Sequence, residues 1–375
     1  MTTRPRVRDT GIVIGAMSPG EHNAITDVPD VRVGHITLIS GDGPHSPGAG
    51  PVRTGVSVVL PHGGNLFRNK VPAAVSVLNG FGKCLGQEQI DELGLIESPI
   101  ALTGTMNVGI VADGIIEHAI RENPDCGVTT STVNAVVTEC SDAYLNDQHG
   151  RHVRQEHVLS SIEGARTGPV TEGNVGAGTG MTLFGFKGGI GTASRRLSER
   201  HGQYTVGVMV LGNCGRREQL RINGAPVGHH LRDWKPAVDG EDTGSIIIIV
   251  ATDAPMLDRA LGRLARRAGM GLARTGSIAA HGSGDYIIAF SNAQQVPHDP
   301  TGQVLTLAQV EETGSLINAL FQATIEATEE AIINALFAAE SMTGRDGNRR
   351  DALPVATAVE IVERYGLARP LENES

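Results

Sequence analysis

The chain has 375 residues, of which 40% are hydrophobic and 19% are charged, so its composition indicates a folded globular protein and excludes a disordered one. The formal net charge is −10, the pI is about 5.7 and no block of Lys and Arg is present, which argues against a nucleic-acid partner. Aromatic residues amount to 3%, which leaves few side chains to stack on bases or sugars.

The chain also lacks the marks of export and of membrane insertion. Its N-terminus is basic but has no apolar segment of signal-peptide length, and no apolar run approaches the ~20 residues that a membrane span needs. Four cysteines occur without a CxxC pair, and their spacing suggests neither a disulfide framework nor a zinc site: Cys84, Cys126, Cys140 and Cys214. We therefore expect buried thiols in a soluble, cytoplasmic protein with no membrane partner.

Predicted strands and helices alternate irregularly along the first half of the chain. Short apolar, β-branched runs bounded by Gly or Pro predict strands at Val56–Leu60, Ala73–Leu78 and Ala135–Glu139. Apolar residues at helical spacing predict helices at Gln87–Leu95 and Gly109–Arg121. No internal repeat or low-complexity segment interrupts this pattern.

The middle of the chain is rich in glycine and loops. Gly173–Gly191 is expected to be loop and turn backbone around a short strand such as Met181–Phe186, and another strand is expected at Tyr204–Leu211. Arg232–Gly244 combines Pro, Gly and charge, so we expect an exposed linker there. The β-branched run Ile246–Val250 comes straight after it, and its density predicts a strand buried on both faces.

The last third of the chain is predicted to contain two helices and a strand. Asp253 can cap a helix that runs from about Ala254 to Ala268 and has one apolar face. A strand is expected at Tyr286–Phe290. A long helix is expected at Ser315–Glu340, and its length and apolar content suggest that it packs along a sheet.

Known signatures for nucleotides and metals are absent from the sequence, which has no GxxxxGK[ST], no HExxH and no GxSxG. Gly176-Ala-Gly-Thr-Gly180 resembles a dinucleotide fingerprint but lacks the third spaced glycine, so a plain glycine turn is favoured. His149 and His152 form an HxxH in a polar stretch, a pair that is more often surface than ligand. We expect neither a metal nor a cofactor.

The junction Gly244-Ser245 differs from these motifs, because a loop ends in Gly and a Ser opens a buried strand. A self-cleaving hydrolase needs this arrangement: the Ser hydroxyl attacks the preceding carbonyl, and Gly lets the backbone bend as the N-to-O acyl shift requires. Water then frees a Ser with its own α-amine, whose reference pKa of about 7.7–8.0 lets it accept the hydroxyl proton. Read alone, a Gly-Ser before a strand is usually only a turn.

Further positions can support such a nucleophile, although each has an ordinary structural alternative. Ser283 and Asp285 lie two residues apart ahead of a strand, so in extended backbone they point the same way; a turn into the strand is the alternative. Asn213, past a strand end, can donate to an oxyanion or only close a turn. Glu139, at a strand end, can bind a substrate ammonium group or be an ordinary charge.

Eight short motifs occur in a fixed order over most of the chain. They are Asn23–His35 (NAITDVPDVRVGH), Asn79–Lys83, Glu172–Met181, Lys187–Gly191, Gly244–Ile247, Ala251–Pro255, Gly282–Asp285 and Met342–Gly347. Together they resemble the D-aminopeptidase/β-peptidyl aminopeptidase family of self-processing N-terminal-nucleophile hydrolases, of the L-aminopeptidase D-Ala-esterase/amidase type. Several motifs in the right order are far more specific than any one of them.

The resemblance implies a four-layer αββα sandwich of the α/β (α+β) class, in which helices cover two central sheets. It also implies one structural domain, residues 1–375, that is cut between Gly244 and Ser245 into an α chain of residues 1–244 and a β chain of residues 245–375. The two chains stay associated, and these heterodimers assemble into homo-oligomers. The family needs no metal and no cofactor.

The resemblance also assigns roles to the candidate residues: Ser245 is the nucleophile, Ser283 and Asp285 are the pair that supports it, Asn213 is an oxyanion donor and Glu139 holds the free amino group of the substrate. The family's type member has a tyrosine two residues after this glutamate, where the chain has Ser141. Its shorter hydroxyl implies a weaker oxyanion hole or a backbone N–H in its place. Asp285 stands where some β-peptide-cleaving members have Glu, which leaves the substrate class open.

The sequence therefore predicts a self-processing serine aminopeptidase, amidase or esterase that releases N-terminal amino acids from small peptides, amides or esters through an acyl-enzyme on Ser245. Two alternatives stay open. One is an acyltransferase of related fold, which passes the acyl group to an amine in preference to water. The other is an uncleaved, non-catalytic scaffold that binds a small ligand.

Overall fold

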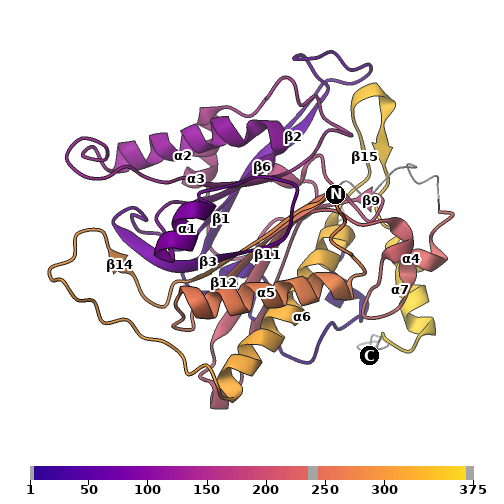
Figure 1. The fold of residues 1–375 in the computed structure, drawn as a ribbon. Helices are drawn as coiled ribbons and strands as arrows, with labels where there is room; N and C mark the ends of the chain where they lie inside the picture. The colour runs from indigo at the N-terminus through magenta and orange to yellow at the C-terminus, as the bar shows by residue number, and fades with distance from the viewer. Residues whose placement is uncertain (1–3, 235–243, 369–375) are drawn as a thin grey trace.

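Two β-sheets lie face to face in the centre of the protein, and helices cover the outer face of each sheet (Figure 1). The structure is a computed structural model and describes residues 4–234 and 244–368. Apolar side chains fill all three interfaces between the layers. The αββα sandwich expected from the sequence is therefore confirmed.

The first sheet has the strand order β1-β2-β6-β7-β4 within the described residues. Its strands are Arg32–Ser40 (β1), Val52–Leu60 (β2), Ile100–Gly104 (β6), Val136–Cys140 (β7) and Cys84–Leu85 (β4). β6 and β7 run parallel, and the other neighbours run antiparallel. The carboxyl ends of β6 and β7 therefore lie at the same edge, and Glu139 lies there, next to the last residue of β7.

The second sheet has the order β10-β11-β12-β13-β3-β14, with β5 also paired to β3. Its strands are Gly189–Arg196 (β10), Thr205–Asn213 (β11), Ser245–Thr252 (β12), Gly284–Ser291 (β13), Asn69–Gly80 (β3), Val296–Pro297 (β14) and Leu95–Ile96 (β5). β12 and β13 run parallel, so they begin at the same edge of the sheet. Strands from before and after residue 244 are thus neighbours in one sheet.

Helices pack on the outer faces of both sheets. The α-helices are Gln87–Leu93 (α1), Val108–Glu122 (α2), Gln155–Glu163 (α3), Val227–His230 (α4), Asp258–Arg274 (α5), Ser315–Ala338 (α6) and Val355–Arg364 (α7). α2 and α3 cover the first sheet, and α5 and α6 cover the second (Figure 1). Within the described ranges, no helix is long and apolar enough to reach across a membrane.

Short elements complete the described chain. The 3-10 turns are Val7–Thr10 (η1), Ile25–Asp27 (η2), Thr105–Asn107 (η3), Gly176–Gly178 (η4), Glu199–His201 (η5), Arg217–Gln219 (η6) and Arg345–Gly347 (η7). Two hairpins stand apart from the large sheets: Thr182–Leu183 (β8) with Phe186–Lys187 (β9), and Met342–Thr343 (β15) with Arg349–Arg350 (β16).

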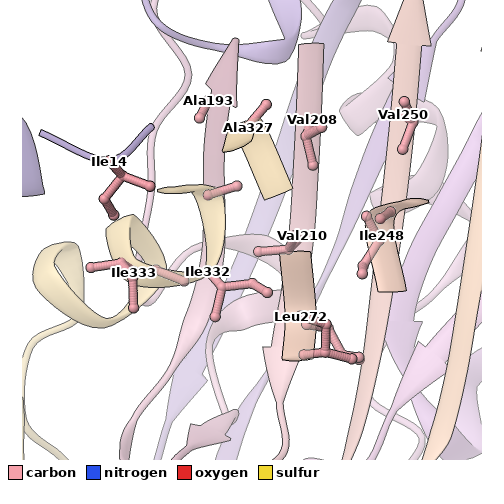
Figure 2. Close-up of a cluster of buried hydrophobic side chains, with 14 of the residues drawn as sticks. Ile14, Ala193, Val208, Val210, Ile248, Val250, Leu272, Ala327, Ile332 and Ile333 are labelled. Carbon is pink, nitrogen blue, oxygen red and sulfur yellow. The ribbon is translucent and has the colours of Figure 1, made fainter. Parts of the chain in front are cut away.

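The β-branched run of β12 fills two layers of the core at once. Side chains alternate between the two faces of a strand, so Ile247 and Ile249 lie between the sheets, and Ile248 and Val250 lie on the side of α5 and α6. Figure 2 shows this outer cluster, in which Ile248 and Val250 lie on the same side of the sheet as Ile332 of α6. All of β12 is buried, which confirms the prediction of a strand covered on both faces.

Most of the expected strands and helices are present, with ends that differ by a few residues. The long helix α6 packs against β10 and β11, as its apolar content predicted. The linker expected at Arg232–Gly244 falls mainly on residues 235–243, which lie outside the described residues. Met181–Phe186 is not one strand, because β8 and β9 flank a turn in which Phe184 has a φ of 48°.

The helix cap expected at Asp253 is wrong. α5 begins at Asp258 and has Leu257 at its N-cap position. The carboxylate of Asp253 instead accepts a hydrogen bond of 2.6 Å from the backbone N–H of Thr205, the first residue of β11. The Asp253 side chain thus bonds the start of a neighbouring strand and does not cap the helix that the sequence pattern assigned to it.

Candidate active site

Ser245 is the first residue of β12, in the middle of the second sheet and only 6% exposed. Its Oγ accepts a hydrogen bond of 3.0 Å from the backbone N–H of Gly284, the first residue of the parallel strand β13. On its other side, Ser245 pairs with Asn213, the last residue of the antiparallel strand β11. The hydroxyl therefore lies where the ends of three neighbouring strands, β11, β12 and β13, meet.

Gly244 packs its backbone directly against that of Asn213. A Cβ built on Gly244 would lie 1.8 Å from the carbonyl oxygen of Asn213 and 2.8 Å from its carbonyl carbon. No side chain fits there without moving β11 away from β12. The structure thus gives a packing reason for glycine at this position, besides the backbone freedom that the sequence argument used.

Ser283 and Asp285 lie together at the start of β13 and are each 1% exposed. The hydroxyl of Ser283 donates to Oδ1 of Asp285 at 2.5 Å, and the same oxygen accepts the backbone N–H of Ile246 at 3.2 Å. Because β12 and β13 are parallel and paired, the pair stands beside the residue that follows Ser245. The structure brings these predicted residues together.

Asn213 is held from both ends of its side-chain amide. Its Oδ1 accepts the backbone N–H of Thr182 at 2.7 Å, and its Nδ2 donates to the carbonyl oxygen of Ser141 at 3.0 Å. The residue lies within β11 rather than beyond it, which corrects the expected strand end at Leu211. A primary amide nitrogen carries two hydrogens, so the group that bonds Ser141 still has a second donor.

Ser141 contributes its backbone to the site. Its carbonyl oxygen orients the amide of Asn213, whereas its hydroxyl accepts a hydrogen bond of 3.2 Å from Nε2 of Gln148. The sequence left two possibilities for this position, a weaker oxyanion hole or a backbone N–H in place of the hydroxyl, and both stay predictions. In this structure the hydroxyl of Ser141 bonds Gln148, and the backbone carbonyl of Ser141 bonds Asn213, the candidate oxyanion donor.

Glu139 is a buried carboxylate, 3% exposed, in β7 of the first sheet. Its Oε1 accepts the backbone N–H of Lys83 at 3.1 Å and lies 3.3 Å from the Lys83 ammonium nitrogen. Its Oε2 accepts the hydroxyl of Thr105. Glu139 is therefore a buried carboxylate that backbone and side-chain donors hold in place, and its binding of a substrate amine stays a prediction.

Gly82 joins the two halves of the site. A Cβ built on it would lie 3.1 Å from Cα of Gly284 and 3.4 Å from Oε1 of Glu139. The backbone of Gly82 is thus wedged between the strand that contacts Ser245 Oγ and the carboxylate of the opposite sheet. This contact puts the candidate nucleophile and the candidate amine-binding group on the two sides of one glycine.

Several contacting residues were not singled out from the sequence. Thr182 and Thr105 are ordinary polar residues with no pattern that marks them. Lys83 ends the motif Asn79–Lys83, and a cation directly after the glycine at position 82 was a usable signal. Asn79 of that motif donates from Nδ2 to carbonyl oxygens of the loop before β13, so it shapes the loop that carries Ser283.

The structure forms no disulfide among the four cysteines, and Cys126, Cys140 and Cys214 are buried as the sequence predicted, whereas Cys84 is partly exposed. Cys140 follows Glu139 directly, and burial, together with the charges of neighbouring groups, raises the pKa of its thiol well above the ordinary value. Its Sγ lies 3.5 Å from the carbonyl oxygen of Leu211. A thiol held in the protonated form is a poor nucleophile at neutral pH, so Cys140 is poorly suited to nucleophilic attack.

The remaining motifs have structural roles. Gly176–Gly178 forms the turn η4, which packs on β1 and β2. Nε2 of His152 lies 3.0 Å from Oδ2 of Asp147, and the backbone N–H of His149 bonds the same carboxylate at Oδ1. In the part of the chain that the structure describes, His, Cys, Asp and Glu side chains form no group of three or more that could hold a metal ion.

Known proteins resemble this chain over most of its length. The family model described as Peptidase family S58 matches residues 23–350. Beta-peptidyl aminopeptidase BapA from Sphingosinicella xenopeptidilytica is 42% identical over 362 residues, which cover 93% of this chain and 89% of that protein.

Solved structures extend this likeness to three dimensions. A crystal structure of a protein from Pyrococcus horikoshii OT3 has a TM-score of 0.92 at 49% identity and covers 96% of this chain and 99% of that one. The L-aminopeptidase D-Ala-esterase/amidase from Ochrobactrum anthropi, described as a prototype serine aminopeptidase with a variant of the Ntn hydrolase fold, has a TM-score of 0.90 at 35% identity. The match covers 98% of this chain and 100% of that one.

Proposed function

The chain belongs to peptidase family S58 and has the Ntn hydrolase fold, and from this premise we propose that it is a self-processing serine aminopeptidase or amidase. In this proposal the bond between Gly244 and Ser245 is cut, and the freed Ser245 is the nucleophile. The smaller product then begins with Ser245, and both products remain parts of one structural domain.

The observation that carries the proposal is the position of Ser245. A hydroxyl with 6% exposure opens a central strand, accepts the N–H of Gly284, and follows a glycine pressed against the Asn213 carbonyl. Its burial and the backbone N–H donated to its Oγ distinguish this serine from one in an ordinary exposed turn. This donor favours negative charge on Oγ as the proton leaves.

Self-cleavage begins when Oγ of Ser245 attacks the carbonyl carbon of Gly244. The C–N bond breaks, the nitrogen keeps the electron pair and gains a proton, and an ester joins Gly244 to Oγ. Water hydrolyses this ester to a carboxylate on Gly244 and the restored hydroxyl of Ser245, whose α-amine was freed when the C–N bond broke. The amine has a reference pKa of about 7.7–8.0, so it can act as a base near neutral pH.

Turnover repeats this chemistry on an external substrate. The α-amine takes the Oγ proton as Oγ attacks the substrate carbonyl, and the spare amide hydrogen of Asn213 stabilises the oxyanion. Ser283 and Asp285 orient the amine from the neighbouring strand. The proton passes to the leaving amine, and water then releases the acyl group from Oγ.

The substrate is proposed to be a small peptide, amide or ester with a free amino group. Glu139 is the anion for that group, because it is buried and held by Thr105 and by the backbone of Lys83. The related BapA is named a beta-peptidyl aminopeptidase, so β-amino acyl substrates are a reasonable first panel. Assembly of two-chain units into a homo-oligomer and a cytoplasmic location also stay predictions.

Intact-mass spectrometry under denaturing conditions tests the proposal. Two fragments are expected, and Edman or tandem-mass sequencing of the smaller should begin at Ser245. A serine-directed acylating probe should label that fragment alone. One unbroken chain without probe labelling would instead support the non-catalytic scaffold, and capture of the acyl group by added amine in preference to water would support the acyltransferase.

A further inference from the structure

The side chain of Lys83 occupies the acceptor that the substrate's amino group is proposed to use. Its ammonium nitrogen lies 3.3 Å from Oε1 of Glu139. The Lys83 side chain is 52% exposed, whereas that of Glu139 is 3% exposed. An ammonium group of this chain, reaching in from solvent, thus sits on the buried carboxylate.

The carboxylate of Glu139 has few acceptor sites left. It offers about four lone-pair positions, and the backbone N–H of Lys83, its ammonium group and the hydroxyl of Thr105 use three of them. A substrate ammonium carries three hydrogens and needs more than one acceptor. If the Lys83 side chain leaves, one acceptor position on Oε1 becomes free in addition to the one that is open on Oε2.

The Lys83 side chain can leave without disturbing Glu139. The backbone N–H of Lys83 and the hydroxyl of Thr105 hold both carboxylate oxygens independently of the lysine side chain. The distance of 3.3 Å is long for a charge-assisted hydrogen bond, which is usually about 2.7–2.9 Å. A half-exposed lysine also finds water as soon as it swings outward.

We propose that Lys83 is a specificity-determining residue whose ammonium group competes with the amino group of the substrate for Glu139. This inference rests on the proposed function. Substrates with a free cationic amine displace Lys83 and take its place, while N-blocked or amine-free substrates have nothing to offer in exchange. Because Lys83 is half-exposed and its contact of 3.3 Å is long, we expect the competition to cost no more than about fivefold in KM.

The test compares Lys83→Met, which keeps the length of the side chain and removes its charge, with the wild type. The probes are β-alanine p-nitroanilide and its amine-free analogue, propionic acid p-nitroanilide. We expect Lys83→Met to lower KM for the β-alanine compound about two- to fivefold, with kcat within about twofold of the wild type. Inhibition by n-propylammonium chloride should strengthen by the same factor, and Lys83→Arg should keep the wild-type KM or raise it.

Two controls separate this effect from general changes. Arg200→Met removes an exposed cation from η5 and should leave KM unchanged. η5 lies in the loop that joins β10 to β11, at the end of β11 remote from Ser245. Propionic acid p-nitroanilide should show no fall in KM with Lys83→Met. The melting temperature and the intact masses of all variants verify that folding and processing are equal.

Each contrary outcome is informative. An unchanged or raised KM for the β-alanine compound in a processed, folded Lys83→Met protein would overturn the inference and leave the proposed function intact. An equal fall in KM for both compounds would also overturn it, because the gain would not depend on the amine. A wild-type protein that is neither cut nor active would overturn the proposed function and the inference with it.

Discussion

Ser245 and Asn213 stand opposite each other in the antiparallel pairing of β12 with β11. The carbonyl of Asn213 presses on Gly244, and its side-chain amide is fixed by Thr182 and Ser141. The bond proposed for self-cleavage and the donor proposed for the oxyanion therefore belong to one pair of facing residues. A change in one of them is expected to disturb both the single cut and the repeated reaction.

Replacing Ser245 with Ala removes the attacking oxygen. We expect Ser245→Ala to fold and to remain one 375-residue chain, with no labelling by a serine-directed probe. Ser245→Cys retains a nucleophile and should be cut, more slowly than the wild type. Denaturing mass spectrometry over time checks both variants. A Ser245→Ala protein that still splits before residue 245 would falsify the mechanism.

Adding one methyl group at Gly244 should slow processing for a steric reason. The Cβ would lie 1.8 Å from the Asn213 carbonyl oxygen, so β11 and β12 must separate or the scissile carbonyl must turn. We expect Gly244→Ala to be cut at least about tenfold more slowly, as measured by the appearance of the smaller fragment. Gly109→Ala is the matched control, because its added Cβ meets nothing within 4 Å. Equal cutting rates in the two variants would contradict this argument.

Removing the donor of Asn213 should slow the reaction without abolishing it. Loss of one oxyanion donor typically costs about 10²–10³ in kcat. Asn213→Asp is the sharper variant, since an oxygen still accepts from Thr182 while the Nδ2 donor is gone. We expect kcat to fall by that factor in both Asn213→Ala and Asn213→Asp, with KM changed far less. A kcat near the wild-type value would exclude Asn213 as the donor.

Lys187 makes stability depend on pH. It is fully buried, donates to the carbonyl oxygens of Gly178 and Gly188, and burial lowers the pKa of its amine to about 7. In the unfolded chain the amine returns to its ordinary value of 10.5. Between these values the unfolded state binds more protons, so the free energy of unfolding rises as pH rises from about 7 to 10.5.

Replacing Lys187 with Met removes this proton uptake. We expect the stability of Lys187→Met relative to its parent to be highest at pH 7 and below and to decline steadily toward pH 10. Urea denaturation at several pH values measures the difference, and Ser245→Ala is the parent of choice because one uncut chain unfolds. Parallel pH profiles of the two proteins would show that the lysine is not responsible.

Patterns within single segments of the sequence predicted the elements whose formation depends on the residues of that segment. The dense β-branched run of β12 and the apolar length of α6 predicted a doubly covered strand and a helix along a sheet, and both are present. The order of motifs predicted the family and its layers. For the strand and the helix, burial of apolar side chains dominates the energetics, and that tendency can be read from a single stretch of sequence.

Contacts between distant segments could not be read in this way. Asp253 matched a helix cap, but the amide of Thr205, 48 residues earlier in the chain, takes its carboxylate. The ammonium of Lys83 reaches Glu139 across 56 residues, and the N–H of Gly284 reaches Ser245 across 39. Strand register fixes such pairs, and register becomes visible only when the sheet is assembled.

In the second sheet, β11 and β3 come from before residue 244, while β12 and β13 between them come from after it. A cut before Ser245 therefore leaves two polypeptides whose strands alternate within one sheet, and neither can depart without breaking a ladder of backbone hydrogen bonds. Once unfolded, the two would be separate molecules that must find each other again, a search that the uncut chain never faces. Cutting would thus make folding a one-way event. The working life of the cut protein would be set by how fast it unfolds, because the path by which it formed no longer exists.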